Sequence, residues 1–217
     1  MLYHFPCQGH IGSMAILKIA RMGHPVLRNP AEAIADPTAP EIRALAEGML
    51  ETMVDAPGVG LAAPQVHVPL RMVIFRVPLT ELESMAGGEA SLTVLINPVL
   101  ESIGEDMEEG WEGCLSVPGL RGHVPRYTHL RYHGVDLTGQ VIDRTVDGFH
   151  ARVVQHECDH LDGILYPQRM TDMTGLIFDS EMRHVIAANR AKELEARELE
   201  AKESEERASE EVEATGK

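Results

Sequence analysis

The pattern of apolar and polar residues predicts a helix in one segment, and the absence of Gly and Pro predicts a helix in a second segment. After Pro40, the apolar positions are Ile42, Leu45, Ala46, Met49, Leu50 and Met53. This three- and four-residue spacing predicts a helix with one apolar face, which begins at Pro40 and ends at Asp55-Ala56-Pro57-Gly58. A second helix is predicted at Phe149–Leu161, because that segment contains neither Gly nor Pro and Gly163 follows it.

Short runs of β-branched residues predict strands between these helices. The run RMVIFRV at Arg71–Val77 indicates a buried strand, and Leu92–Ile96 indicates a second strand that ends at Asn97-Pro98. From Leu100 to Asp147 the pattern is one of short strands interrupted by Gly and Pro. Within it, VDLTGQVID predicts a hairpin whose turn lies at Leu137–Gly139.

The composition is that of a globular protein with an excess of acid. The 217 residues include 34 Asp+Glu against 19 Lys+Arg, a formal net charge of -15, and 44% are hydrophobic. This length and composition can form a hydrophobic core, while the acidity argues against a basic face that binds DNA or RNA. No stretch approaches 18 consecutive apolar residues, so no membrane-spanning helix is expected.

Three cysteines, Cys7, Cys114 and Cys158, are too few for a disulfide framework and fit a reducing cytoplasm.

Three regions are expected along the chain. Residues 1–13 lack the basic and apolar parts of a secretory signal and precede a second methionine, so we expect an unstructured leader or an upstream-start extension. Residues 14–188 are expected to form one catalytic domain. Residues 189–217 contain 10 Asp+Glu against 6 Lys+Arg and few large apolar residues, which predicts a charged C-terminal helix that frays into disorder.

The strongest chemical signal is the sequence QHECDH at Gln155–His160, inside the second predicted helix. His156 and His160 are four residues apart, so both imidazoles can face one metal ion. Glu157 lies beside them and could handle a proton on metal-activated water. Because the HExxH pattern also arises by chance, the alternative is two surface histidines beside a glutamate in a salt bridge.

Two upstream segments contribute further candidates. EGCLS at Glu112–Ser116 puts Cys114 in a loop between strand-like segments, where a thiolate could be a third metal ligand. A lone cysteine is otherwise more often a small buried hydrophobic residue. GVGLAAPQ at Gly58–Gln65 is rich in small residues, which let a ligand or another chain approach the backbone closely. Taken alone, that segment would be a tight turn.

Together, GVGLAAPQ, EGCLS and QHECDH resemble the three signature motifs of peptide deformylases, over a span from about Ala15 to about Met170. The resemblance implies an α+β fold, with small antiparallel sheets packed around the HExxH helix and a C-terminal helix. It also implies a cytoplasmic, bacterial hydrolase that removes the N-formyl group from the initiator methionine of nascent chains and releases formate. The alternatives are a metal-dependent hydrolase of another acyl amide or peptide, and a non-catalytic peptide-binding relative.

The resemblance assigns the catalytic roles residue by residue. Cys114, His156 and His160 would be the metal ligands, with water in the fourth position. Glu157 would be the general base, and the Gln65 side chain and the Leu115 backbone N–H would stabilise the oxyanion. Family members generally use Fe²⁺, and Zn²⁺, Ni²⁺ and Co²⁺ can also occupy the site; a thiolate with two imidazoles does not distinguish these ions.

The resemblance also implies where the substrate binds. The peptide would lie as an added strand against Val59, Gly60 and Gly113, with Arg121 as a further contact. The methionine side chain would enter a pocket lined by Phe149 and Val153, which share a helix face with the histidines. Core packing is the alternative for these last two residues.

Residues around the metal ligands carry further expectations. Glu112 and Asp159 are the acids available to accept a hydrogen bond from a ligating imidazole, and Arg126 could neutralise one of them; a surface charge pair is the alternative. Cys158 and Trp111 are expected to be packing residues. We expect N-formylmethionyl nascent peptides as partners and at most transient ribosome contact, which the acidic tail would not provide.

Overall fold

The computed structural model describes residues 16–77, 92–188, 190, 191, 194 and 197. Two α-helices are described, α1 (Pro40–Asp55) and α3 (Gly148–Leu161), and helical residues also occupy positions 182–188. Short 3-10 turns lie at Pro25–Leu27, Ala63–Val66, Tyr166–Gln168, Met173–Gly175 and Asp179–Glu181. The expected leader at 1–13 and most of the expected helix at 189–217 lie outside the described residues, and the division into three regions stays a prediction.

Eight strands in the described residues form two antiparallel sheets. The larger sheet has the order β1-β2-β3-β6-β7, and the smaller has the order β4-β5-β8. The strands of the larger sheet are β1 (Gly60–Ala62), β2 (Met72–Arg76), β3 (Leu92–Ser102), β6 (His129–Val135) and β7 (Val141–Asp147). Those of the smaller sheet are β4 (Met107–Cys114), β5 (Val117–Tyr127) and β8 (Ile177–Phe178). The α+β architecture predicted from the sequence is confirmed.

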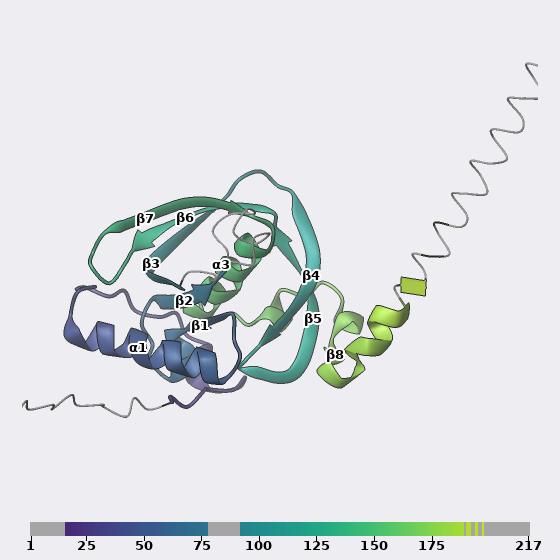
Figure 1. Cartoon of the computed structure of the whole chain (residues 1–217), viewed down its shortest axis with the longest axis horizontal. Coiled ribbons are helices and arrows are strands. Elements are labelled where there is room, and N and C mark those ends of the chain that lie inside the picture. The colour runs from purple at the N-terminus through teal and green to yellow at the C-terminus, as the bar shows by residue number, and fades with distance from the viewer. Residues whose placement is uncertain (1–15, 78–91, 189, 192–193, 195–196, 198–217) are drawn as a thin grey trace, which may run out of the picture.

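Helix α3 lies at the centre of the molecule, between the two sheets (Figure 1). It contacts β1, β2, β6 and β7 of the larger sheet and β5 of the smaller one, while α1 packs against β1 and β2. The predicted bounds of α1 are confirmed, and α3 begins one residue earlier than predicted and ends where predicted. The HExxH helix is therefore enclosed by sheet on two sides, as the resemblance implied.

Strand β2 is buried on both faces, which explains why its sequence is a continuous apolar run. Val73 and Phe75 pack into the cluster that includes α3, whereas Met72 and Ile74 pack into the cluster that includes α1. The larger sheet thus has one helix on each face. Among the helices that the structure describes, none combines the length and the apolarity needed to cross a bilayer.

The predicted end of a strand at Asn97-Pro98 is wrong. Strand β3 continues to Ser102 through a register shift between Ile96 and Val99, and Asn97 adopts a left-handed conformation with φ 51°. The Asn97 side chain donates to the carbonyl of Ile34 and accepts from its N–H, both at 2.9 Å. This pair of bonds stabilises a bulge, so the turn signal produces a bend within one strand. The predicted hairpin is confirmed as β6 and β7.

Phe75 provides a test of the core. Its ring is fully buried and lies edge-on to Tyr132 at 6.2 Å between centroids. Phe75→Ala should lower the free energy of unfolding by about 3–5 kcal/mol, because it removes a large buried side chain and leaves a cavity. The same substitution at Phe178, whose side chain is exposed, should change it by about 0.5 kcal/mol or less. Urea denaturation of both variants would measure the difference, and equal losses would contradict this account of the core.

Candidate metal centre

Three potential metal donors converge between the smaller sheet and α3. Cys114 ends β4, and His156 and His160 lie one turn apart on α3 with their ring centroids 5.1 Å apart. The Cys114 Sγ is 3.3 Å from Nε2 of His160, and one donor atom from each of the three residues lies within 4.8 Å of the others. A cation with metal–sulfur and metal–nitrogen bonds near 2.3 and 2.0 Å would hold such atoms about 3.5 Å apart at tetrahedral angles. The spacing therefore fits a shared ion.

The local charges favour the ligand form of Cys114. Although burial by itself raises the pKa of the thiol, the charge of His160 and hydrogen bonds from both histidines lower that pKa well below its ordinary value. The thiolate is the form of cysteine that binds metals. In the described residues, the buried atoms Nδ1 of His160 and Oε2 of Glu157 have no hydrogen-bond partner. A donor set of thiolate and two imidazoles fits a transition-metal ion.

Glu112 fixes the orientation of His156. Its Oε2 is 2.7 Å from Nδ1 of His156, which leaves Nε2 of that ring for a metal. Burial raises the pKa of Glu112, but hydrogen bonds from Arg126 and His156 outweigh this effect and lower it to about 2. The carboxylate is therefore ionised and can accept a hydrogen bond from the Nδ1–H group of His156. Glu112 and Asp159 were the two acids expected in this role, and Glu112 is the one that lies at the His156 imidazole.

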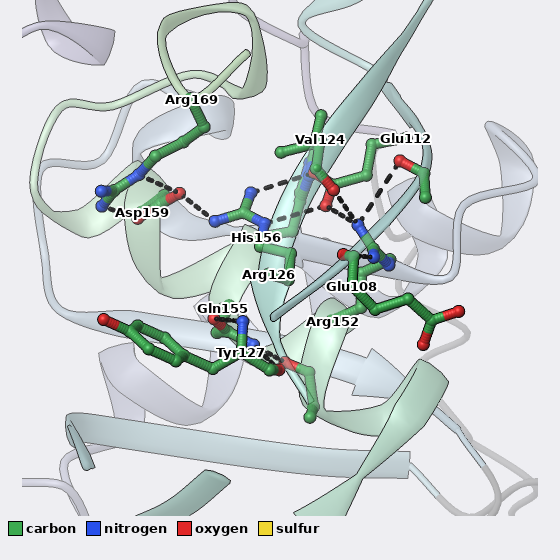
Figure 2. Close-up of polar contacts among 12 residues, drawn as sticks. Glu108, Glu112, Val124, Arg126, Tyr127, Arg152, Gln155, His156, Asp159 and Arg169 are labelled. Carbon is green, nitrogen blue, oxygen red and sulfur yellow. Dashed lines mark hydrogen bonds and ion pairs between the residues drawn. The ribbon is translucent and has the colours of Figure 1, made fainter. Parts of the chain in front are cut away.

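Arg126 links the two candidate acids. It donates to both oxygens of Glu112, at 2.8 and 3.0 Å, and to Asp159 at 2.5 Å. All three side chains are buried, and Arg169 donates to Asp159 from the other side (Figure 2). Arg126 thus neutralises both acids, and it does so in the interior. The alternative of a charge pair on the surface is therefore wrong.

Arg152 was missed by the sequence analysis. From α3 it donates to Oε1 of Glu112 and to three backbone carbonyls of β4 and β5, those of Glu108, Gly110 and Val124 (Figure 2). A Cβ built on Gly110 would lie 2.7 Å from Cζ of Arg152, so this glycine leaves the space that the guanidinium occupies. Arg152 therefore fastens the sheet that carries Cys114 to the helix that carries the histidines. Its place one turn before His156 was the available sequence signal.

Glu157 lies beside the three donors and is buried. Burial raises the pKa of its carboxyl group to about 7, against the lowering effect of His156 and His160. Strand β1 packs directly on this side chain: a Cβ built on Gly60 would overlap Oε1 and lie 2.6 Å from Cδ. A larger residue than glycine at position 60 would therefore displace the carboxylate. A group with a pKa near neutrality can both accept and release a proton.

Gln65 presents its amide nitrogen to the same place. The Ala62 backbone N–H donates to Oε1 at 2.8 Å, which orients the amide. Nε2 then lies 3.5 Å from Sγ of Cys114 and 3.2 Å from Oγ of Ser116. Leu115 occupies the turn between β4 and β5, next to Cys114. Gln65 and Leu115, the two predicted oxyanion donors, therefore both lie beside Cys114.

A cavity of about 530 Å³ opens onto these groups. The predicted substrate-binding residues all line it, namely Val59, Gly60, Gly113, Arg121, Phe149 and Val153. Trp111 lines it as well, so packing is not its whole environment, whereas Cys158 packs in the core as expected. A cavity of about 610 Å³ on the opposite face of α3 contains none of the three donor residues.

Comparisons with known proteins agree on one family. The family model "Polypeptide deformylase" matches residues 16–175. The chain is 56% identical over 158 residues to peptide deformylase 1 of Nitrosomonas europaea, which covers 73% of this chain and 89% of that protein. It is 54% identical over 156 residues to peptide deformylase 1 of Bordetella pertussis, which covers 72% and 88%.

Solved structures give the same result. The peptide deformylase from Synechococcus elongatus in complex with actinonin has a TM-score of 0.65 and 34% identity, over 73% of this chain and 81% of that chain. The Met-Ala-Ser-bound class I type b peptide deformylase from Acinetobacter baumannii also has a TM-score of 0.65 and 34% identity, over 72% and 99%.

Arg152→Met tests how the two halves of the site are held together. We expect metal affinity to fall about 10- to 100-fold, because Glu112 loses a partner and β4 loses its carbonyl contacts with α3. Competition for Co²⁺ with a chromophoric chelator would measure the loss. Arg131→Met, which removes an exposed ion pair with Asp143, is the matched control and should bind as the wild type does. Unchanged affinity in a folded Arg152→Met protein would refute the role given to Arg152.

Proposed function

Because this chain belongs to the polypeptide deformylase family, which removes the formyl group from N-formylmethionine of nascent peptides, we propose how its residues carry out that hydrolysis of an amide bond. The proposal is carried by one observation: the Cys114 thiol and the imidazoles of His156 and His160 lie within 4.8 Å of one another, and Cys114, His156 and the buried Glu157 line a single cavity. Cys114, His156 and His160 would hold one divalent metal ion. Fe²⁺ is the proposed ion, with Zn²⁺, Ni²⁺ and Co²⁺ as alternatives that the same donors accept.

The bound ion would lower the pKa of water and polarise the formyl oxygen. Glu157 supplies the proton transfers. It accepts a proton from the attacking water and delivers one to the amine nitrogen as the C–N bond breaks, so that the products are formate and a free N-terminus. Its pKa of about 7 and its burial beside the histidines support this assignment.

Gln65 and Leu115 would stabilise the negative charge that develops on the formyl oxygen. The bond from Ala62 to Oε1 keeps the Gln65 amide N–H group turned toward Cys114. The Leu115 backbone N–H is proposed as the second donor, because its turn adjoins Cys114 at the wall of the cavity. Loss of one such donor typically costs about 10²–10³ in rate.

The sheet order supports binding of the peptide as an added strand. Strand β1 ends the order of the larger sheet and β4 ends that of the smaller one, and both contribute residues to the cavity. A peptide that lies between them can bond to Val59, Gly60 and Gly113 through its backbone, which gives affinity without dependence on sequence. Phe149 and Val153 would receive the methionine side chain. The relative that binds Met-Ala-Ser suggests formyl-Met-Ala-Ser as the test substrate.

The curated relatives are bacterial, and we propose a bacterial cytoplasm as the location. Nascent chains that begin with formylmethionine are the proposed partners. Contact with the ribosome would be transient and would not use a basic tail, since residues 189–217 contain 10 Asp+Glu against 6 Lys+Arg.

Glu157→Gln separates chemistry from metal binding. Anaerobic formate release from formyl-Met-Ala-Ser should fall at least about 100-fold, because the amide cannot accept a proton, while metal content stays at the wild-type level. Cys114→Ser should instead lose metal, and Glu105→Gln in an exposed turn should behave as the wild type. Full activity in metallated Glu157→Gln would rule out this general base.

The identity of the metal is tested by exposure to air. Iron-loaded protein should lose formate release over hours in air, because a ferrous ion bound to a thiolate is readily oxidised. Nickel-loaded protein should keep its activity. Formate assays at intervals, with metal content measured in parallel, would follow both forms, and equal stability would count against the role proposed for iron.

A further inference from the structure

We propose that Asp179 cancels the charge of Arg121 at the mouth of the cavity, so that the enzyme accepts acidic and basic residues after the formylmethionine with similar efficiency. This inference rests on the proposed function, since it concerns the same cavity. It assigns a specificity-determining role to a residue that lies beyond residues 16–175, the part that the family model matches.

Arg121 lies beside the path proposed for the peptide. In the register of β4 and β5 it pairs with Gly113, which is the residue before Cys114. A Cβ built on Gly113 would be 3.7 Å from Cζ of Arg121, so the guanidinium lies over the face of β4 that glycine leaves open. Both residues line the cavity. A peptide added along β4 would therefore pass close to this positive charge.

The segment after β5 brings Asp179 to Arg121. Strand β8 pairs with β5 in the register Leu120↔Phe178 and Arg121↔Ile177, and Asp179 follows directly. The Asp179 Oδ1 is 2.5 Å from Nε of Arg121. Both side chains are about half exposed, at 45% and 48%, and both line the cavity. The ion pair therefore lies at the mouth of the cavity and in contact with solvent.

The charges deeper in the cavity are paired or buried. The ion pair of Arg121 and Asp179 therefore sets the net charge at the mouth. Glu112 and Arg152 bond to each other inside, at 3.0 Å, and Glu157 is buried. Without Asp179, a peptide that leaves the cavity would meet one uncompensated positive charge. An enzyme that must act on chains with any residue after methionine gains breadth from a neutral mouth. An exposed pair contributes little to stability, so its placement here has more effect on binding than on folding.

The test compares formyl-Met-Ala-Glu with formyl-Met-Ala-Lys at low ionic strength. The wild-type ratio of kcat/KM for the two peptides should lie within about twofold of one. Asp179→Asn should shift the ratio toward the acidic peptide by about threefold, a size typical of exposed charge interactions. Arg121→Gln should shift it toward the basic peptide. The double variant should return to the wild-type ratio, and high salt should weaken both single shifts.

The controls separate selectivity from structure. Glu181→Gln removes one acid two residues further on, outside the cavity lining, and should leave the ratio unchanged. Formyl-Met-Ala-Ser serves as the neutral reference. An unchanged ratio in Asp179→Asn, or an equal loss on all three peptides, would overturn the inference while the proposed function stands. No formate release from metallated wild type on any peptide would overturn the proposed function, and this inference with it.

Discussion

The buried carboxylate of Glu112 holds the residues of the candidate metal centre together. It is ionised in the interior, where a charge must be paired to be tolerated, and it accepts bonds from His156, Arg126 and Arg152. These partners come from α3 and β5, whereas Glu112 itself lies on β4, two residues before Cys114. The position of the thiolate relative to the imidazoles is therefore determined by an interaction between sheet and helix. Removal of any one partner would leave a buried charge partly unpaired, typically at a cost of about 3–5 kcal/mol.

The elements around this carboxylate are regular and well packed, which keeps the donor atoms in place. Helix α3 presents His156 and Glu157 to the cavity, while Val154 and Cys158 on its other side pack in the core against the larger sheet. A site built on helices and strands is more rigid than one built on loops. The residues proposed to bond to the substrate backbone, Val59, Gly60 and Gly113, lie instead at or next to strand edges, where an incoming backbone can bond.

The sequence predicted those features that depend on local spacing. The positions of His156 and His160 on one helix face, the thiol of Cys114 and both helix ranges followed from periodicity and from the three motifs. The sequence did not predict contacts between distant segments. Asn97 bonds to Ile34, Arg152 reaches carbonyls on two strands, and Asp179 meets Arg121 across 58 positions of sequence. In each case a side chain of ordinary local character acquires its role only when the fold brings a partner to it. The roles of all the site residues stay predictions: metal binding by Cys114, His156 and His160, proton transfer by Glu157, oxyanion stabilisation by Gln65 and Leu115, and contact with the substrate by the residues that line the cavity.

A cavity between two strand edges also creates a risk of self-association. An edge that is open to an added peptide strand is also open to the edge of another copy, which is how sheet proteins aggregate. Strand β1 is only three residues long, which limits the number of ladder bonds that a second molecule could form. Strand β4 carries the exposed acids Glu108 and Glu109 in its first half. Like charges there repel an identical strand, so colloidal stability and an open binding edge are compatible in one molecule.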